Sequence, residues 1–140
     1  MKNLETIIEE YAAKFTSAMN NAIANGKSEE DIRARASHVI SDFLKATKLN
    51  ITSFHEYGLK GGRIDSKYGG FIIEYKSPFG SDALRESNSF SANQKLIKQI
   101  QSRFSDFESS EGISKNRVFA AGLDGNRIIF ARFYGPQFHV

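Results

Sequence analysis

The sequence predicts an α/β protein of the α+β type, in which a small mixed β-sheet is flanked by helices in the order α-α-β-β-β-α-β-β. The first observation is that apolar residues recur every three or four positions up to residue 43 and again over residues 92–108, which is the period of a helix. The second is that the remaining segments carry short apolar runs bounded by glycine, as strands do. The third is the length, since 140 residues with 40% hydrophobic content correspond to one domain.

Two helices are predicted at the start of the chain. Residues 1–26 form the N-terminal helix, which closes at Asn25-Gly26 because glycine tolerates the left-handed conformation that ends a helix. Ser28 then N-caps the second helix together with Asp31, and this helix fades near residues 48–50. The apolar stripe of the first helix consists of Leu4, Ile8, Tyr11, Phe15, Met19 and Ala22, and the residues predicted to form the buried face of the second are Ile32, Ala36, Val39, Ile40 and Phe43.

The strands come from the remaining segments, which are rich in β-branched and aromatic residues. Polar residues 79–91 form a loop before the third helix. Asp124 is predicted to form the tight turn of a closing hairpin with Gly125 rather than to bind a ligand. The predicted strands are 51–57, 63–66, 71–76, 117–123 and 127–133. The aromatic residues that alternate along them and are predicted to lie in the core are Phe71, Tyr75, Phe119, Phe130 and Phe133.

Composition excludes several classes of site. The chain has no cysteine, which rules out disulfides, thiolate metal sites and a cysteine nucleophile. Its three histidines never stand four residues apart, so zincin-like sites are absent. No apolar run approaches the ~18 residues of a membrane span and the start is acidic, so we expect a cytoplasmic protein without a membrane partner. The net charge of +3 permits a phosphate-backbone partner without demanding one.

The chemistry-bearing residues lie on two neighbouring predicted strands. Glu74 and Lys76 leave the same face of the strand 71–76, and a turn through Tyr68-Gly69-Gly70 can bring Asp65 beside Glu74. Two adjacent carboxylates repel each other, and a hard cation such as Mg²⁺ cancels that cost. A lysine beside such a site can orient a water or neutralise charge on a phosphate. The same Glu-x-Lys pattern also occurs on ordinary solvated strand faces, and both interpretations stay open here.

A family resemblance adds to this pattern. The ordered series is SEEDIR at 28–33, HE at 55–56, GRID at 62–65 and IIEYKSP at 72–78. It resembles the PD-(D/E)xK nuclease superfamily, and more narrowly the amino-terminal nuclease domains of type I and single-chain restriction enzymes. The resemblance implies a restriction-endonuclease-like core over residues 28–133 in a single nuclease-like domain, 1–140. Ile64 stands where the family has proline. The end at Val140 suits either a natural terminus or the cut edge of a longer protein.

The resemblance assigns roles to individual residues. Asp65 and Glu74 match the metal-binding carboxylates for Mg²⁺, with Mn²⁺ as a substitute, and Lys76 matches the catalytic lysine. Glu29 matches the glutamate that the family places on the helix before the sheet; a first-turn acid that complements the helix dipole is the alternative. Gln99 matches a helix glutamine, with Arg103 where the family has tyrosine, and Gln94 and Gln101 are the other candidates.

The predicted function is therefore a metal-dependent DNA endonuclease domain. Arg63, Lys67 and Arg103 are candidates for DNA binding, and a solvated surface is the alternative for the first two. The resemblance implies a larger restriction-modification or defence enzyme with a fused or associated helicase, translocase or methyltransferase, and a homodimer is plausible because two strands must be cut. A nuclease-fold domain without catalysis, acting as a DNA-binding or scaffold module, is the second hypothesis. A nuclease for RNA or branched DNA is the third.

Overall fold

The computed structural model describes residues 2–25, 28–59 and 61–140. Within them a mixed six-stranded sheet lies between helices, which confirms the predicted fold class and the order of its elements up to residue 134. The helices are α1 (Leu4–Ala24), α2 (Glu29–Ala46) and α3 (Ser91–Glu111), with short 3₁₀ turns η1 (Gly80–Asp82) and η2 (Lys115–Arg117). The strands are β1 (Ser53–Leu59), β2 (Gly62–Tyr68), β3 (Phe71–Tyr75), β4 (Phe119–Leu123), β5 (Ile128–Tyr134) and β6 (Gln137–His139).

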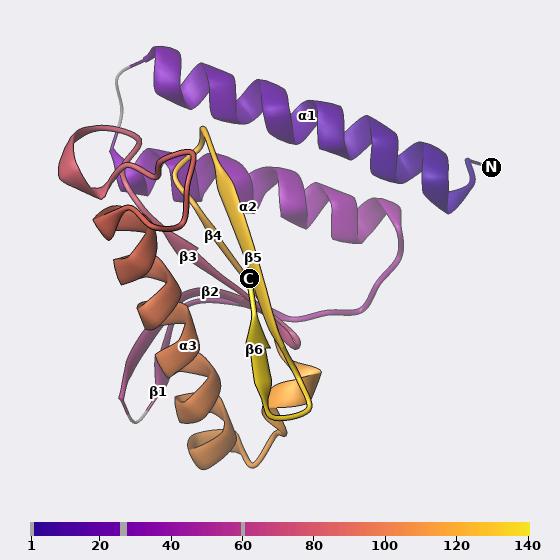
Figure 1. The fold of residues 1–140 in the computed structure, drawn as a ribbon. Coiled ribbons are helices and arrows are strands. Elements are labelled where there is room, and N and C mark those ends of the chain that lie inside the picture. Colours follow the sequence, from indigo (N-terminus) through magenta and orange to yellow (C-terminus); the bar gives the residue numbers. More distant parts are fainter. Residues whose placement is uncertain (1, 26–27, 60) are drawn as a thin grey trace.

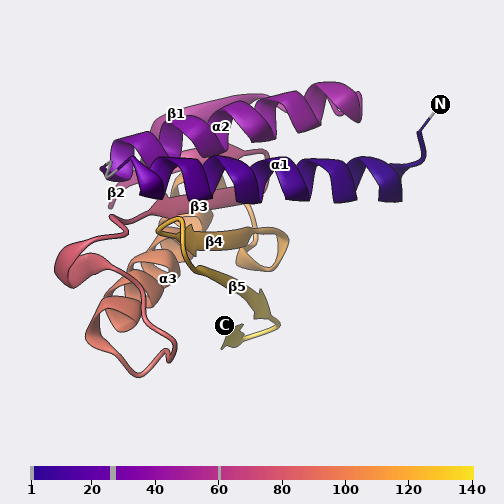
Figure 2. The ribbon, with the colours of Figure 1, turned by 90° about the horizontal axis from the view of Figure 1, so that it is seen from above.

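The molecule has three layers. α1 and α2 lie side by side on one face of the sheet, and α3 lies on the other (Figures 1 and 2). The strands follow one another in sequence order, and every neighbouring pair is antiparallel except β3 and β4. This parallel pair requires a crossover, which α3 supplies. α3 therefore lies on the face of the sheet toward which Glu74 points.

The helix boundaries follow from local capping. The Asn3 side chain accepts a hydrogen bond from the backbone N–H of Thr6 at 2.8 Å, which starts α1. The carboxylate of Asp31 accepts from the backbone N–H of Ser28 at 3.2 Å, so the predicted cap of α2 is confirmed. α1 ends before Asn25, and the predicted role of Gly26 in closing it lies outside the described residues.

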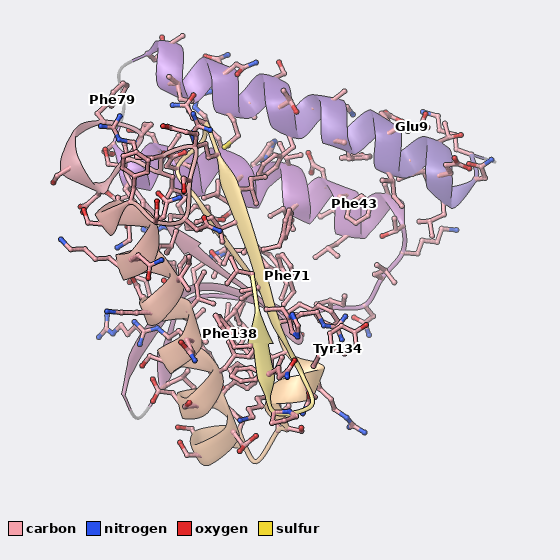
Figure 3. All side chains as sticks on the ribbon, in the orientation of Figure 1. Glu9, Phe43, Phe71, Phe79, Tyr134 and Phe138 are labelled. Carbon is pink, nitrogen blue, oxygen red and sulfur yellow. The ribbon has the colours of Figure 1, made fainter. Side chains whose placement is uncertain are left out.

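Each face of the sheet has its own core. The core between the sheet and α3 contains Ile72 of β3 together with Leu96, Ile100 and Phe104 of α3. Phe138 of β6 packs on the same side, with its ring centroid 5.9 Å from that of Phe104 (Figure 3). The opposite core joins α1 and α2 to the inner strands through Met19, Ala22, Ile32, Ala36, Tyr68, Ile73, Tyr75 and Leu123. The alternation along β3 places Ile72 and Glu74 on one face, as predicted, and this face meets α3.

Three sequence predictions about the fold are corrected. The chain does not stop pairing after the hairpin, because residues 137–139 form β6 beside β5. Gly58, which directly follows the predicted strand 51–57 and is expected to form a turn, lies inside β1. Phe119 and Phe130 are 43% and 62% exposed, because α1 and α2 cover β2, β3 and the end of β4 while no described helix covers this face of β5. None of the described helices combines the length and apolar content that a membrane span requires.

Candidate functional site

A local irregularity in the β1–β2 hairpin positions Asp65. Pairing continues on both sides of this point, with His55 opposite Ser66 and Tyr57 opposite Ile64, but Glu56 and Asp65 do not pair. Glu56 has φ of 54°, a left-handed conformation that is uncommon for a residue other than glycine. The pairing of β2 with β3 extends from the turn only to Ser66, the residue after Asp65, so Asp65 has no partner on β3 either. The Asp65 carboxylate takes the place of this pairing and accepts the backbone N–H of Tyr75 at 2.8 Å.

Glu74 and Asp65 form a contacting pair of carboxyl groups. Glu74 lies on β3 opposite Gly122 of β4 and is completely buried. Burial, which disfavours a charge, and the nearby charge and hydrogen bond of Asp65 together raise the pKa of Glu74 to about 8. The turn after Tyr68 thus brings together the two carboxylates that the sequence predicted to be neighbours.

Two side chains from α3 reach Glu74. Gln99 donates from Nε2 to Glu74 Oε2 at 3.2 Å, and Arg103 donates from Nε to Glu74 Oε1 at 2.9 Å. The arginine opposes the effect of burial, since its positive charge and hydrogen bond lower the pKa of Glu74. Gln99 and Arg103 lie four residues apart on one face of α3, so both side chains can reach the same carboxylate. Gln99 therefore reaches the site, and Arg103 reaches it as an ion-pair partner.

Glu29 approaches the same group from the other layer. It lies in the first turn of α2, on an exposed part of the surface. Partial burial of its carboxyl group and the charge of Asp65 raise its pKa, while the charges of Lys76 and Arg33 lower it. The charges of Asp65 and Lys76 both act on Glu29, which indicates that the three groups lie near one another. Lys76 itself is half-buried, and its backbone N–H donates to the carbonyl of Leu123 at 2.9 Å.

The remaining candidates lie around this group. Arg63 is exposed, whereas Lys67 lies over the rings of Phe54, Tyr57 and Phe107 at 5.1–5.5 Å. Their predicted contacts with DNA remain predictions. The alternative glutamines lie elsewhere: Gln94 donates to the carbonyl of Asn88, and Gln101 is exposed on α3.

A surface hollow of about 300 Å³ opens beside Glu29. Its other lining residues are Ser28, Glu30, Arg33 and Glu56. Arg33 pairs with Glu30 at 3.2 Å and with Glu56 at 3.4 Å, and the Glu30 side chain is 80% exposed. The hollow gives solvent, and any bound molecule, a route to Glu29.

The loop after β3 is anchored from two directions. Asp124 is buried and accepts the backbone N–H of Leu84 at 2.8 Å, as well as those of Asn126 and Arg127 in its own turn. Asn93 of α3 holds the other end through the N–H and carbonyl of Arg85 at 2.8 and 3.0 Å. Asp124 therefore forms the turn, as predicted, and also fixes the loop that borders the site.

The sequence alone does not identify two acids at the site. Asp82 of η1 raises the pKa of Glu29 through its negative charge. Asp106 of α3 lies 3.6 Å from Nη1 of Arg103. Asp106 stands three residues after Arg103, a spacing typical of a helix ion pair, and this spacing could have identified Asp106 from the sequence. Asp82 lies in an irregular loop whose path no periodicity reveals.

Whether a divalent cation can bind at this site depends on which side chains can act as its ligands. Asp65 and Glu74 are contacting carboxyl groups whose repulsion a bound cation relieves. Among residues 2–25, 28–59 and 61–140, no three His, Cys, Asp or Glu side chains gather closely enough to hold a metal. Asp65 and Glu74 are therefore the two carboxylates here that could hold a cation, which would have to take its other ligands largely from water.

Comparison with family models, with curated proteins and with solved structures gives no match for this chain. The functional argument therefore rests on the residues and their geometry.

Proposed function

We propose that this chain is a metal-dependent DNA endonuclease domain of the PD-(D/E)xK type. The observation that carries the proposal is the contact between Asp65 and the buried Glu74, with Lys76 two residues further along the chain. A buried carboxyl group beside a second acid is unfavourable in itself, and groups with a strongly shifted pKa, such as Glu74, are concentrated at functional sites. Glu29 from α2 and Gln99 from α3 supply two further polar groups beside the pair.

The two carboxylates are the residues that would hold Mg²⁺, or Mn²⁺ in its place. When bound, the cation would polarise a phosphate oxygen and lower the pKa of a water. Without a cation, the acidic surroundings, to which Glu29 and Asp82 contribute, would repel a phosphate backbone. The two carboxylates and the negative charge of a phosphate backbone therefore both favour a divalent cation as the cofactor.

The other residues have separate roles in the proposed hydrolysis. Lys76 orients the attacking water and neutralises the charge that develops on the phosphate. Glu29, whose pKa is raised, accepts a proton more readily at neutral pH than an ordinary glutamate does. Gln99 fixes the orientation of Glu74 through the hydrogen bond to Oε2.

The substrate and the wider protein belong to the same proposal. Arg63 and Lys67 on β2 would contact the DNA backbone next to Asp65. The domain would act in the cytoplasm within a restriction-modification or defence enzyme that also carries a helicase, translocase or methyltransferase. A pair of such domains would cut both strands.

The first test is calorimetric titration of Mn²⁺ into the wild-type chain and into Glu74→Gln, with and without a short duplex DNA. We expect the wild-type chain to bind Mn²⁺, more strongly with DNA present, and Glu74→Gln to lose the binding. Absence of binding by the wild-type chain in the presence of DNA would contradict the proposal.

Cleavage of plasmid DNA then tests the individual roles. Asp65→Asn, Glu74→Gln and Lys76→Ala should each lower the rate about 100-fold or more, because each removes a metal ligand or the charge beside the phosphate. Lys98→Ala is the matched control, since Lys98 is exposed on α3. Structured RNA and a branched DNA serve as alternative substrates in the same assay. Equal activity of Lys76→Ala and Lys98→Ala would remove Lys76 from the mechanism.

One observation favours a second function, that of a nuclease-fold domain that binds DNA or a partner without cutting. Arg103 already occupies Glu74 in the structure, with its Nε 2.9 Å from Oε1. A chain in which this ion pair is permanent would bind no cation. Retention of duplex DNA by the wild-type chain, with no uptake of Mn²⁺, would favour this second function.

A further inference from the structure

Arg103 is the cation that accompanies Glu74 in this structure. Its Nε lies 2.9 Å from Glu74 Oε1, and the two side chains are 13% and 0% exposed. Because both groups are so well shielded from water, their attraction is strong whenever Glu74 is ionised. The other oxygen of Glu74 accepts the Gln99 amide at 3.2 Å. Both oxygens of the proposed metal ligand are therefore engaged by the chain itself.

The far end of the Arg103 side chain is held as well. Nη1 lies 3.6 Å from Asp106 Oδ2, so a second carboxylate lies beside the guanidinium. Gly61 and Gly62, where β2 begins, lie close against this pair, since a Cβ on Gly62 would lie 2.5 Å from Arg103 Nη1 and one on Gly61 would lie 2.4 Å from Asp106 Oδ1. The two glycines allow the hairpin to pack against the ion pair, beside the exposed Arg63.

A divalent cation on Glu74 must compete with this arrangement. A guanidinium and a metal ion on one carboxylate repel each other, and the repulsion is strong at a buried position. The metal therefore gains its ligand only when Arg103 withdraws from Oε1. A group that attracts Arg103 would lower this cost, and a phosphate diester does so because arginine forms paired hydrogen bonds with phosphate oxygens.

We propose that Arg103 is an internal competitor of the metal, which occupies Glu74 until a DNA backbone phosphate draws its guanidinium away. Metal and DNA then bind cooperatively, and the site is charged with metal only when substrate is present. This inference rests on the proposed function, because it assumes that Asp65 and Glu74 hold the cation.

The test measures the Mn²⁺ dissociation constant by calorimetry in the wild-type chain and in Arg103→Gln, with and without duplex DNA. Glutamine keeps a hydrogen-bond donor for Glu74 but removes the charge. We expect Arg103→Gln to bind Mn²⁺ about 5 to 150-fold more tightly than the wild-type chain without DNA, the usual range of such couplings. DNA should tighten Mn²⁺ binding in the wild-type chain and have much less effect in Arg103→Gln.

Two controls complete the titration. Arg117→Gln makes the same change of charge at an exposed position just before β4, whereas Glu74 lies opposite Gly122 near the end of that strand. It should bind Mn²⁺ as the wild-type chain does. Inorganic phosphate in place of DNA shows whether a free anion is enough to withdraw Arg103.

The failure of this inference differs from the failure of the proposed function. If Mn²⁺ binding is lost in Glu74→Gln but is equal in the wild-type chain and Arg103→Gln, the metal site stands and the competition is wrong. If no variant takes up Mn²⁺ in a Glu74-dependent way, with or without DNA, both are wrong.

A measurement on the wild-type chain covers the case in which Arg103→Gln does not fold. The ¹⁵Nε–H resonance of Arg103 should report the ion pair with Glu74, and it should shift when duplex DNA and Mg²⁺ are added together. A resonance that stays unchanged while metal binds would overturn the proposal.

Discussion

Glu74 is a carboxyl group in a place that disfavours charge. It has no exposed surface, and it contacts another acid, Asp65. Gln99 and Arg103 donate hydrogen bonds to it, but burial and Asp65 outweigh the lowering effect of Arg103, so that the pKa of Glu74 rises to about 8. The folded protein therefore tolerates an unfavourable group at the proposed site, which is common where a side chain serves function rather than stability.

The raised pKa predicts how stability depends on pH. The pKa of Glu74 is about 8 in the folded chain against an ordinary value of 4.5, so the folded state binds the proton more tightly. The contribution of the protonated group to stability is complete below pH 4.5 and is lost as the pH rises through about 8. We expect the wild-type chain without divalent cations to lose at least about 1 kcal/mol, or about 3 °C in Tm, over this range.

Glu74→Gln is the matched variant for this prediction, because glutamine has the same shape and does not titrate. Thermal unfolding at several pH values in the presence of a chelator should give a flatter dependence for Glu74→Gln. The pH dependence of Tm that remains in Glu74→Gln would include the titration of Glu29, whose pKa is also raised. The same slope in both proteins would show that Glu74 titrates normally.

At the scale of elements, the packing of α3 on β4 brings Gln99 and Arg103 to Glu74. Gly122 pairs with Glu74 across the parallel strands and lies under α3. A Cβ at Gly122 would lie 2.4 Å from Leu96 Cδ2 and 3.1 Å from Ile100 Cδ1. The helix can approach the sheet closely only because this position has no side chain.

We therefore predict that Gly122→Ala destabilises the fold. The added methyl group overpacks the core between α3 and the sheet, which costs about 1 to 3 kcal/mol of unfolding free energy. Gly58→Ala is the control, because a Cβ there meets nothing within 4 Å. It should change stability by about 0.5 kcal/mol or less. Urea unfolding measures both, and equal losses would mean that α3 does not pack as described.

At the scale of the whole molecule, the two faces of the sheet are covered unequally. α3 and β6 close one face around Phe104, which is fully buried. On the other face, α1 and α2 lie over the inner strands (Figure 2), and the outer face of β5 carries Phe130 and Tyr134 in contact with solvent. A phenylalanine in the core under α3 therefore contributes much more to stability than one on the outer face of β5.

This asymmetry predicts different costs for one substitution. Phe104→Ala should lose about 3 to 5 kcal/mol of unfolding free energy, because it leaves a cavity in a closed core. Phe130→Ala should lose about 0.5 kcal/mol or less, because the Phe130 ring is 62% exposed. Denaturant unfolding compares the two. A large loss for Phe130→Ala at low protein concentration would show that this face is covered within the chain.

The sequence by itself determined what depends on near neighbours. The alternation along 71–75, the cap formed by Ser28 and Asp31 and the turn at Asp124 follow from local geometry, and the structure contains each of them. The neighbouring positions of Asp65 and Glu74 also follow, because a tight turn joins their strands. β6 escaped prediction because a three-residue strand has almost no pattern of its own and is defined by pairing with β5.

Only the tertiary structure decided what surrounds that pair. The ion pair between Arg103 and Glu74, the approach of Glu29 and Asp82, and the exposure of Phe130 depend on how elements distant in sequence pack together. Sequence periodicity states that a helix has a buried face, but it does not state which strand residue that face meets. The closeness of α3 to the sheet, which Gly122 permits, sets that meeting and with it the charge balance of the site.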